Sequence, residues 1–95
     1  MDKYIETNKL TKIVARMSKA DSSYFYFTLE SNEGIAFYST LTDSLRKEYR
    51  DVLVHSPIEM TQALDQIIET SKKMYPIEIL SRETVIDSPD YEFKL

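Results

Sequence analysis

The chain has 95 residues, enough for one domain with its own core, and its 42% hydrophobic and 29% charged residues are typical of a chain that folds unaided. It contains no cysteine, which excludes disulfides, thiolate metal sites and cysteine nucleophiles. The net charge is −4 and the basic residues are scattered, which argues against nucleic acid as a partner because an acidic surface repels phosphate.

No stretch approaches the roughly 20 apolar residues of a membrane span. Residues 1–9 lack the apolar run of a secretory signal. We therefore expect a cytoplasmic protein with no membrane partner. The single glycine, Gly34, also rules out a glycine-rich phosphate-binding loop.

Residues 10–17 predict a first strand. One face carries Ile13, Ala15 and Met17, and the other carries Lys12, Val14 and Arg16.

Residues 22–32 allow two interpretations, a helix or a strand. Asp21 or Ser22 is a suitable N-cap and Gly34 follows the segment, which favours a helix, whereas aromatic residues alternate along it as in a strand. We favour the helix, with an arc of about 200° facing the sheet and Tyr26 left outside it. That arc contains Tyr24, Phe25, Phe27, Thr28 and Leu29.

Residues 35–41 and 49–55 predict two further strands that pair antiparallel. Ser56-Pro57-Ile58-Glu59 then forms a capping box, with Ser56 as the N-cap of a second helix and Pro57 in its first position. Apolar and small residues recur along that helix at helical spacing, at Met60, Ala63, Leu64, Ile67, Ile68 and Ser71. Residues 77–80 predict a fourth strand.

The resulting order, βαββαβ, predicts an α+β, ferredoxin-like sandwich with a four-stranded antiparallel sheet and two helices on one face. We expect the domain to span residues 9–82, after an N-terminal extension of residues 1–8. Residues 83–95 form a C-terminal tail that keeps several large apolar side chains, so it can dock on the domain.

Three segments resemble a family of small uncharacterised bacterial proteins: residues 21–36, the pair Ser56-Pro57, and residues 76–80. The resemblance covers residues 10–82 and implies the fold but no activity. More distantly, the layout is similar to the ACT regulatory domains, which pair side by side and hold amino acids near the first strand-to-helix turn. That turn is Lys19-Ala20-Asp21-Ser22 here, without the glycine of ACT domains, so a small-molecule-sensing function is the alternative prediction.

The sequence predicts neither an enzyme nor a cofactor or metal site. His55 is the only histidine, and no spacing places acidic or imidazole neighbours beside it. The serines lack the context of a catalytic triad.

The sheet face without helices is the most informative feature for function. If Ile13, Phe37, Val52 or Val54, and Ile79 face the helices, alternation places five apolar residues on the opposite face: Val14, Ala36, Tyr38, Leu53 and Leu80. A face this apolar calls for a cover, which could be the tail, a second copy or another protein. We expect a homodimer through this face, with Val14, Tyr38, Leu53 and Leu80 as the interaction residues. RNA could also stack on Tyr38, but the second strand has no basic residue and the third has only Arg50.

Overall fold

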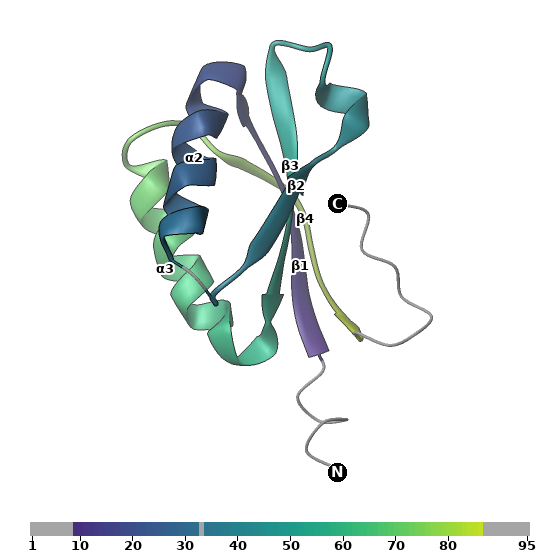
Figure 1. The fold of residues 1–95 in the computed structure, drawn as a ribbon, viewed down its shortest axis with the longest axis vertical. Coiled ribbons are helices and arrows are strands. Elements are labelled where there is room, and N and C mark those ends of the chain that lie inside the picture. The colour runs from purple at the N-terminus through teal and green to yellow at the C-terminus, as the bar shows by residue number, and fades with distance from the viewer. Residues whose placement is uncertain (1–8, 33, 87–95) are drawn as a thin grey trace.

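The computed structural model describes residues 9–32 and 34–86 and confirms the α+β prediction, with two helices on one face of a four-stranded sheet (Figure 1). The strands and α-helices are β1 (Lys9–Ser18), α2 (Lys19–Ser31), β2 (Phe37–Thr40), β3 (Tyr49–Pro57), α3 (Thr61–Lys72) and β4 (Glu78–Ile86). Short 3-10 helices lie on either side of β3, namely η1 (Thr42–Ser44) and η2 (Ile58–Met60). The predicted extension 1–8 and residues 87–95 of the predicted tail lie outside the described residues.

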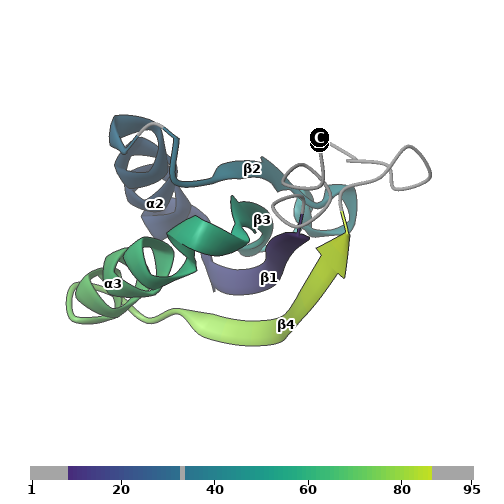
Figure 2. The same cartoon turned by 90° about the horizontal axis from the view of Figure 1, so that it is seen from below.

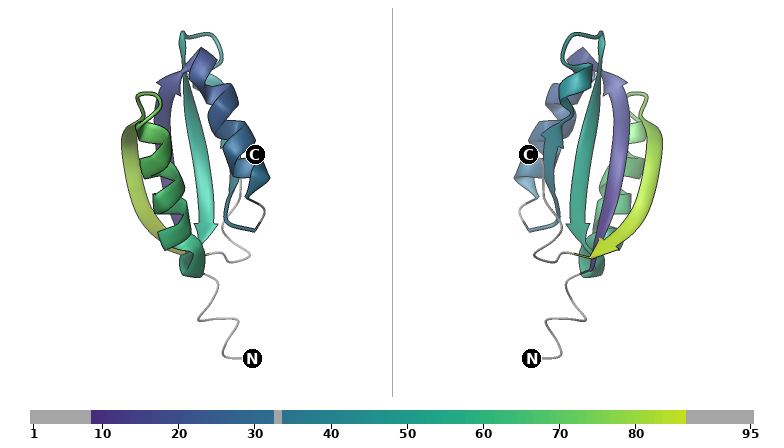
Figure 3. Two further views of the ribbon diagram at one scale, coloured as in Figure 1. Left: turned by 90° about the vertical axis from the view of Figure 1, so that its left-hand side faces the viewer. Right: turned by 90° about the vertical axis from the view of Figure 1, so that its right-hand side faces the viewer.

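The sheet has the order β2-β3-β1-β4, and each neighbouring pair is antiparallel, as the ferredoxin-like layout requires. Side chains alternate across the two central strands, so one face of each meets the helices. The core between the layers consists mainly of Ile13, Ala15, Met17, Phe25, Leu29, Val52, Val54, Leu64 and Ile68. Figures 2 and 3 show both helices on this side of the curved sheet.

The segment with two interpretations is helix α2. Its N-cap is Ser18, whose hydroxyl accepts a hydrogen bond of 3.0 Å from the backbone N–H of Asp21. Because Ser18 is also the last residue of β1, strand and helix join with no loop residue between them. Gly34, just past the helix, has a φ of +84°, a conformation that favours glycine.

The wide arc predicted for this helix is wrong. The buried stripe is narrow and follows Ser22, Phe25 and Leu29, with Tyr26 packed half-buried beside it. Tyr24 and Phe27, which were expected to face the sheet, point to solvent instead.

The capping box predicted at Ser56 is also wrong. Ser56 and Pro57 still belong to β3, and η2 separates them from α3, which begins at Thr61 without a side-chain cap. The Ser56 hydroxyl is fully buried and donates instead to the carbonyl of Ile35, which ties β3 to the segment before β2. This hydrogen bond to Ile35, which is distant in the sequence, takes the place of the predicted bond to the start of the helix.

The last strand is longer than the predicted residues 77–80, because β4 continues to Ile86. Its pairing with β1 shifts between Val14 and Ala15, which leaves Leu80 as the extra residue of a β-bulge. Ile79 precedes the bulge and packs against the core.

Candidate functional site

The polar residues considered for chemistry take part in structural contacts. His55 is 1% exposed on β3, and its ring stacks on Phe37 with 6.2 Å between centroids. The hydroxyl of Ser56 is engaged by a backbone carbonyl, as described above. Within residues 9–32 and 34–86, no three His, Asp or Glu side chains cluster closely enough to hold a metal ion. None of the helices described here is long and apolar enough to cross a membrane.

Three of the four predicted interaction residues lie on or beside the open face of the sheet. Val14 and Leu53 are partners across β1 and β3 and point away from the helices, because their chain neighbours form the core. Leu80 lies next to Val14 at the bulge of β4 and is 40% exposed. These three residues form an apolar row across the middle of the sheet.

The assignment of the fourth residue, Tyr38, to the open face is wrong. Tyr38 pairs with Val54, which faces the helices, and its ring stacks on Tyr26 of α2 at 4.7 Å between centroids. Its hydroxyl donates to the carboxylate of Glu30. Burial, together with this hydrogen bond to a carboxylate, raises the pKa of Tyr38 to about 12. Phe37 takes the open face in its place and is 41% exposed.

A shift of one residue in the register of a strand exchanges its two faces. β2 carries an aromatic side chain on each face, Phe37 and Tyr38, so hydrophobicity alone does not decide which one points inward. On the helix side the hydroxyl of Tyr38 finds a hydrogen-bond partner in Glu30, which favours the observed register. Ala36, also expected on the open face, packs against the core as well.

The centre of the open face is already buried in the single chain. Leu53 is 7% exposed and Leu10, at the start of β1, is 5% exposed, although both helices lie on the other side of the sheet (Figure 3). His55 is buried between them on β3. The most accessible apolar side chains of this face among the described residues are therefore Phe37 and Leu80 on its flanks, while Val14 and Val85 are half-buried.

Charged side chains flank the apolar centre. The guanidinium of Arg16 donates two hydrogen bonds to the carboxylate of Asp51, with Nε–Oδ1 at 2.7 Å and Nη2–Oδ2 at 3.0 Å. The same group lies 4.0 Å from the centre of the Tyr49 ring. The hydrogen bond to Asp51 raises the pKa of Arg16, which therefore stays charged. On β4, Glu83 pairs with Lys12 at 3.6 Å.

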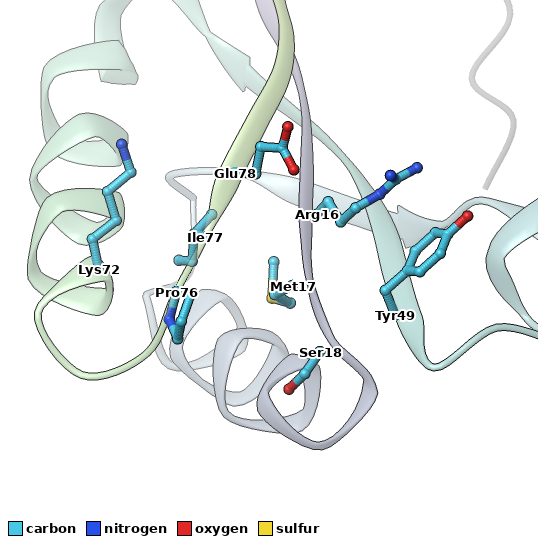
Figure 4. A pocket seen from close by; sticks show the side chains of 8 residues that line it. All are labelled: Arg16, Met17, Ser18, Tyr49, Lys72, Pro76, Ile77 and Glu78. Atoms are coloured by element: carbon cyan, nitrogen blue, oxygen red, sulfur yellow. The ribbon is translucent and has the colours of Figure 1, made fainter.

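The hollow in Figure 4 lies where β4 begins beside the end of β1. Its volume is about 550 Å³, and it is lined by Arg16, Met17, Ser18, Tyr49, Lys72, Pro76, Ile77 and Glu78. Both cations of this hollow already form ion pairs. Arg16 pairs with Asp51, and Lys72 pairs with Glu69 at 3.5 Å. They also lie on opposite sides of β1 (Figure 4). These groups do not converge on a common ligand.

A second hollow, of about 620 Å³, lies at the first strand-to-helix turn. An effector site at this turn is predicted only through the likeness to ACT domains. The hollow is lined by Ser18, Lys19, Ala20, Ser22, Ser23, Tyr26, Glu48 and Arg50. The guanidinium of Arg50 is engaged by three backbone carbonyls, those of Ser44, Lys47 and Tyr49. Lys19 is thus the cation that a small anion could meet there.

An apolar surface that the sequence analysis did not foresee lies on the outer side of the helices. Tyr24 and Phe27 of α2 are 65% and 70% exposed, and Met74, in the turn after α3, is 66% exposed. These three residues, here called the α2–α3 patch, line a hollow of about 310 Å³ together with Asp21, Thr28 and Tyr75. The spacing of Ser22, Phe25, Tyr26 and Leu29, at i, i+3, i+4 and i+7, is the signal that could have indicated the outward position of Tyr24 and Phe27.

No protein-family model and no curated protein sequence matches this chain. The resemblance to a family of small bacterial proteins and to ACT domains therefore stays a prediction, as does the cytoplasmic location.

Proposed function

We propose that this domain acts by binding a second copy of itself, without chemistry of its own, and that the α2–α3 patch is the contact surface. The observation that supports this proposal is the exposure of Tyr24, Phe27 and Met74, each about two-thirds accessible and all around one hollow. Contiguous apolar patches of several hundred Å² on soluble proteins usually mark an interaction site.

The size of the patch fits a modest dimer interface. With about 200 Å² per large side chain, two-thirds exposure corresponds to about 400 Å² of apolar surface on each copy. Two copies would bury about 800 Å² from these residues alone, and polar residues at the rim would bring the total towards the roughly 1,200 Å² at the lower limit of stable interfaces. At about 25 cal/mol per Å² this gives a gross gain of about 20 kcal/mol, which exceeds most estimates of the cost of association.

The shape of the patch suits a two-fold contact. In such a contact the same surface serves both partners, so it must contain a projection and a recess that fit each other. Phe27 projects from α2 next to the hollow, which has room for one aromatic side chain of the other copy. Asp21 at the rim and Lys73 beside Met74 supply opposite charges around the apolar centre.

Sedimentation equilibrium on two variants tests the proposal. Phe27→Glu places a charge in the centre of the patch and should convert the dimer to a monomer. Phe37→Glu makes the same change on the sheet face and is the matched control, which should remain a dimer. A wild-type chain that stays monomeric at high micromolar concentration would contradict self-association altogether.

The same pair of variants tests the homodimer that the sequence predicts through the sheet face. That arrangement would use Val14, Leu53 and Leu80, and the exposed flanks at Phe37 and Leu80 support it. If Phe37→Glu gives the monomer and Phe27→Glu does not, the contact lies on the sheet face and the α2–α3 patch is wrong.

A small-molecule-sensing function is the second candidate, and the hollow at the first strand-to-helix turn favours it. A thermal-shift screen of amino acids and nucleotides should then reveal a ligand that stabilises the fold. Lys19→Ala should abolish the shift. No stabilisation by any compound at millimolar concentration would count against this function.

A further inference from the structure

The hollow of the α2–α3 patch brings together aromatic rings from two elements. Figure 3 shows α2 and α3 running in opposite directions, so the first half of α2 lies beside the turn that follows α3. Tyr24 of α2 and Tyr75 of that turn meet there, with their ring centroids 6.4 Å apart and their planes inclined at 33°. Both residues line the hollow, as does Phe27. A small group in the hollow would therefore contact aromatic rings on more than one side.

Among the described residues that line this hollow, only Asp21 is charged, and it is half-buried. Burial raises the pKa of Tyr75, and the negative charge of Asp21 adds to the rise, so the carboxylate lies near that ring. Within residues 9–32 and 34–86, Asp21 has no ion-pair partner. A carboxylate that is partly removed from water and lacks a cationic partner favours a ligand that brings a positive charge.

The neighbouring polar groups do not supply this charge. Lys73, in the turn after α3, is exposed and does not line the hollow. Lys19, two residues before Asp21, lines the other hollow at the strand-to-helix turn. The hydroxyl of Thr28, which does line the hollow, donates a hydrogen bond of 2.9 Å to the carbonyl of Tyr24. The carboxylate of Asp21 and the aromatic rings are thus available to a ligand.

An organic cation is the ligand class that suits both the rings and the carboxylate. A cation is attracted to the face of an aromatic ring when it lies within about 6 Å of the ring centroid, and quaternary ammonium groups are commonly bound in this way. Two centroids 6.4 Å apart can both meet this distance for a single cation. The volume of about 310 Å³ is at the lower end for ligand pockets, which limits the ligand to a small molecule. An anion would be repelled by Asp21, and a metal ion would need more oxygen ligands than one carboxylate supplies.

We propose that this hollow binds a small quaternary ammonium compound of the choline type, with its methyl groups against the rings of Tyr24 and Tyr75 and its charge beside the carboxylate of Asp21. The inference goes beyond the proposed self-association and does not depend on it. An aromatic side chain of a second copy would fill the same hollow, so the ligand and the second copy exclude each other.

A titration of the isotopically labelled full chain with choline chloride, followed by the NMR shifts of the backbone amides, tests the proposal. Saturable shifts are expected in residues 21–28 and 73–75, and sodium chloride at the same concentration is the reference for the effect of ionic strength. The neutral analogue of choline, in which carbon replaces the nitrogen, has the same shape without the charge. It should bind at least about fivefold more weakly.

Two variants of the hollow separate the charge from the rings. Asp21→Asn removes the charge and keeps the shape of the side chain, and Tyr24→Leu removes a ring but keeps an apolar side chain. Each should weaken choline binding at least about threefold. The matched controls are Asp43→Asn, at an exposed position of η1, and Phe37→Leu on the sheet face, which should leave the affinity unchanged.

Absence of saturable shifts at millimolar choline would overturn the proposal, and so would shifts centred elsewhere or equal binding of the neutral analogue. The amide spectrum of each variant shows whether it folds, and Tyr24→Leu decides if Asp21→Asn does not. A chain that dimerises through the patch but does not bind choline contradicts only this inference. A monomeric chain that binds choline in the hollow contradicts only the proposed self-association.

Discussion

Replacing Phe25 by alanine should remove a large part of the stability of this domain, whereas the same replacement at Phe27 should change it very little. The two residues are of the same type, lie on the same helix and are two positions apart. Phe25 is fully buried between α2 and the sheet, and Phe27 is 70% exposed. The comparison therefore tests which side of α2 faces the core.

Truncation of a fully buried phenylalanine typically costs about 3–5 kcal/mol, because apolar contacts are lost and a cavity remains. A chain of 95 residues has a total stability of about 5–14 kcal/mol, so Phe25→Ala should lower the melting temperature by at least about 12 °C. At Phe27 about a third of the side chain is buried, which corresponds to a loss of about 0.5–1 kcal/mol. The higher helix propensity of alanine offsets about 0.5 kcal/mol of that loss.

Urea unfolding followed by circular dichroism measures both variants, with an unchanged slope showing that the same surface is exposed on unfolding. Protein concentrations should be low enough that association does not contribute to the stability. Equal losses at the two positions would refute the orientation of α2, and with it the α2–α3 patch.

Two further predictions concern buried polar contacts. Ser56→Ala should lower the free energy of unfolding by about 1–3 kcal/mol, measured in urea, because the carbonyl of Ile35 loses its donor; a change below about 0.5 kcal/mol would show that the hydrogen bond is not needed. The pKa of Tyr38, raised from 10.0 to about 12, favours the protonated phenol in the folded state, so its contribution to stability is complete below pH 10 and is lost as the pH rises through 12. Tyr75 also has a pKa raised by burial, so in a spectroscopic titration of tyrosinate Tyr38→Phe should remove one of the late-titrating components, and a titration that keeps all of them would contradict the contact with Glu30.

The parts of the fold that could be predicted are those in which the sequence shows one strong periodic pattern and no second pattern that favours a different structure. Ile13, Ala15 and Met17 alternate in β1, and Leu64, Ile68 and Ser71 follow helical spacing in α3, so the buried faces of β1 and of α3 from Thr61 onward were predicted correctly. The predicted start of the second helix and the inward position of Met60, which is 40% exposed, were wrong. The order of the elements then determines the ferredoxin-like layout almost by itself.

The errors occur where local preference and tertiary contacts compete. In α2 nearly every residue from Tyr24 to Leu29 is large and apolar or aromatic, so the buried stripe is difficult to separate from exposed residues. In β2 the aromatic pair Phe37 and Tyr38 leaves the register open, and the choice depends on Glu30, which is distant in sequence. At Ser56 the local capping pattern competes with the carbonyl of Ile35, and no local rule anticipates that partner.

The candidate surfaces, too, could be predicted only in part. The apolar character of the sheet face was visible in the alternation of Val14 and Leu53, but their degree of burial depends on what covers them. The α2–α3 patch could not be foreseen without the correct orientation of α2, because Met74 comes from a turn 47 residues after Phe27 in the chain.

β1 continues directly into α2, and β3 continues through η2 into α3, with no loop residue at either crossover. Hinge motions need a few flexible positions that can absorb changes in backbone dihedral angles, and these junctions provide almost none. The helical layer is therefore held at a fixed angle to the sheet. A molecule that binds on either side therefore binds to a rigid surface, and the domain loses little conformational entropy on binding.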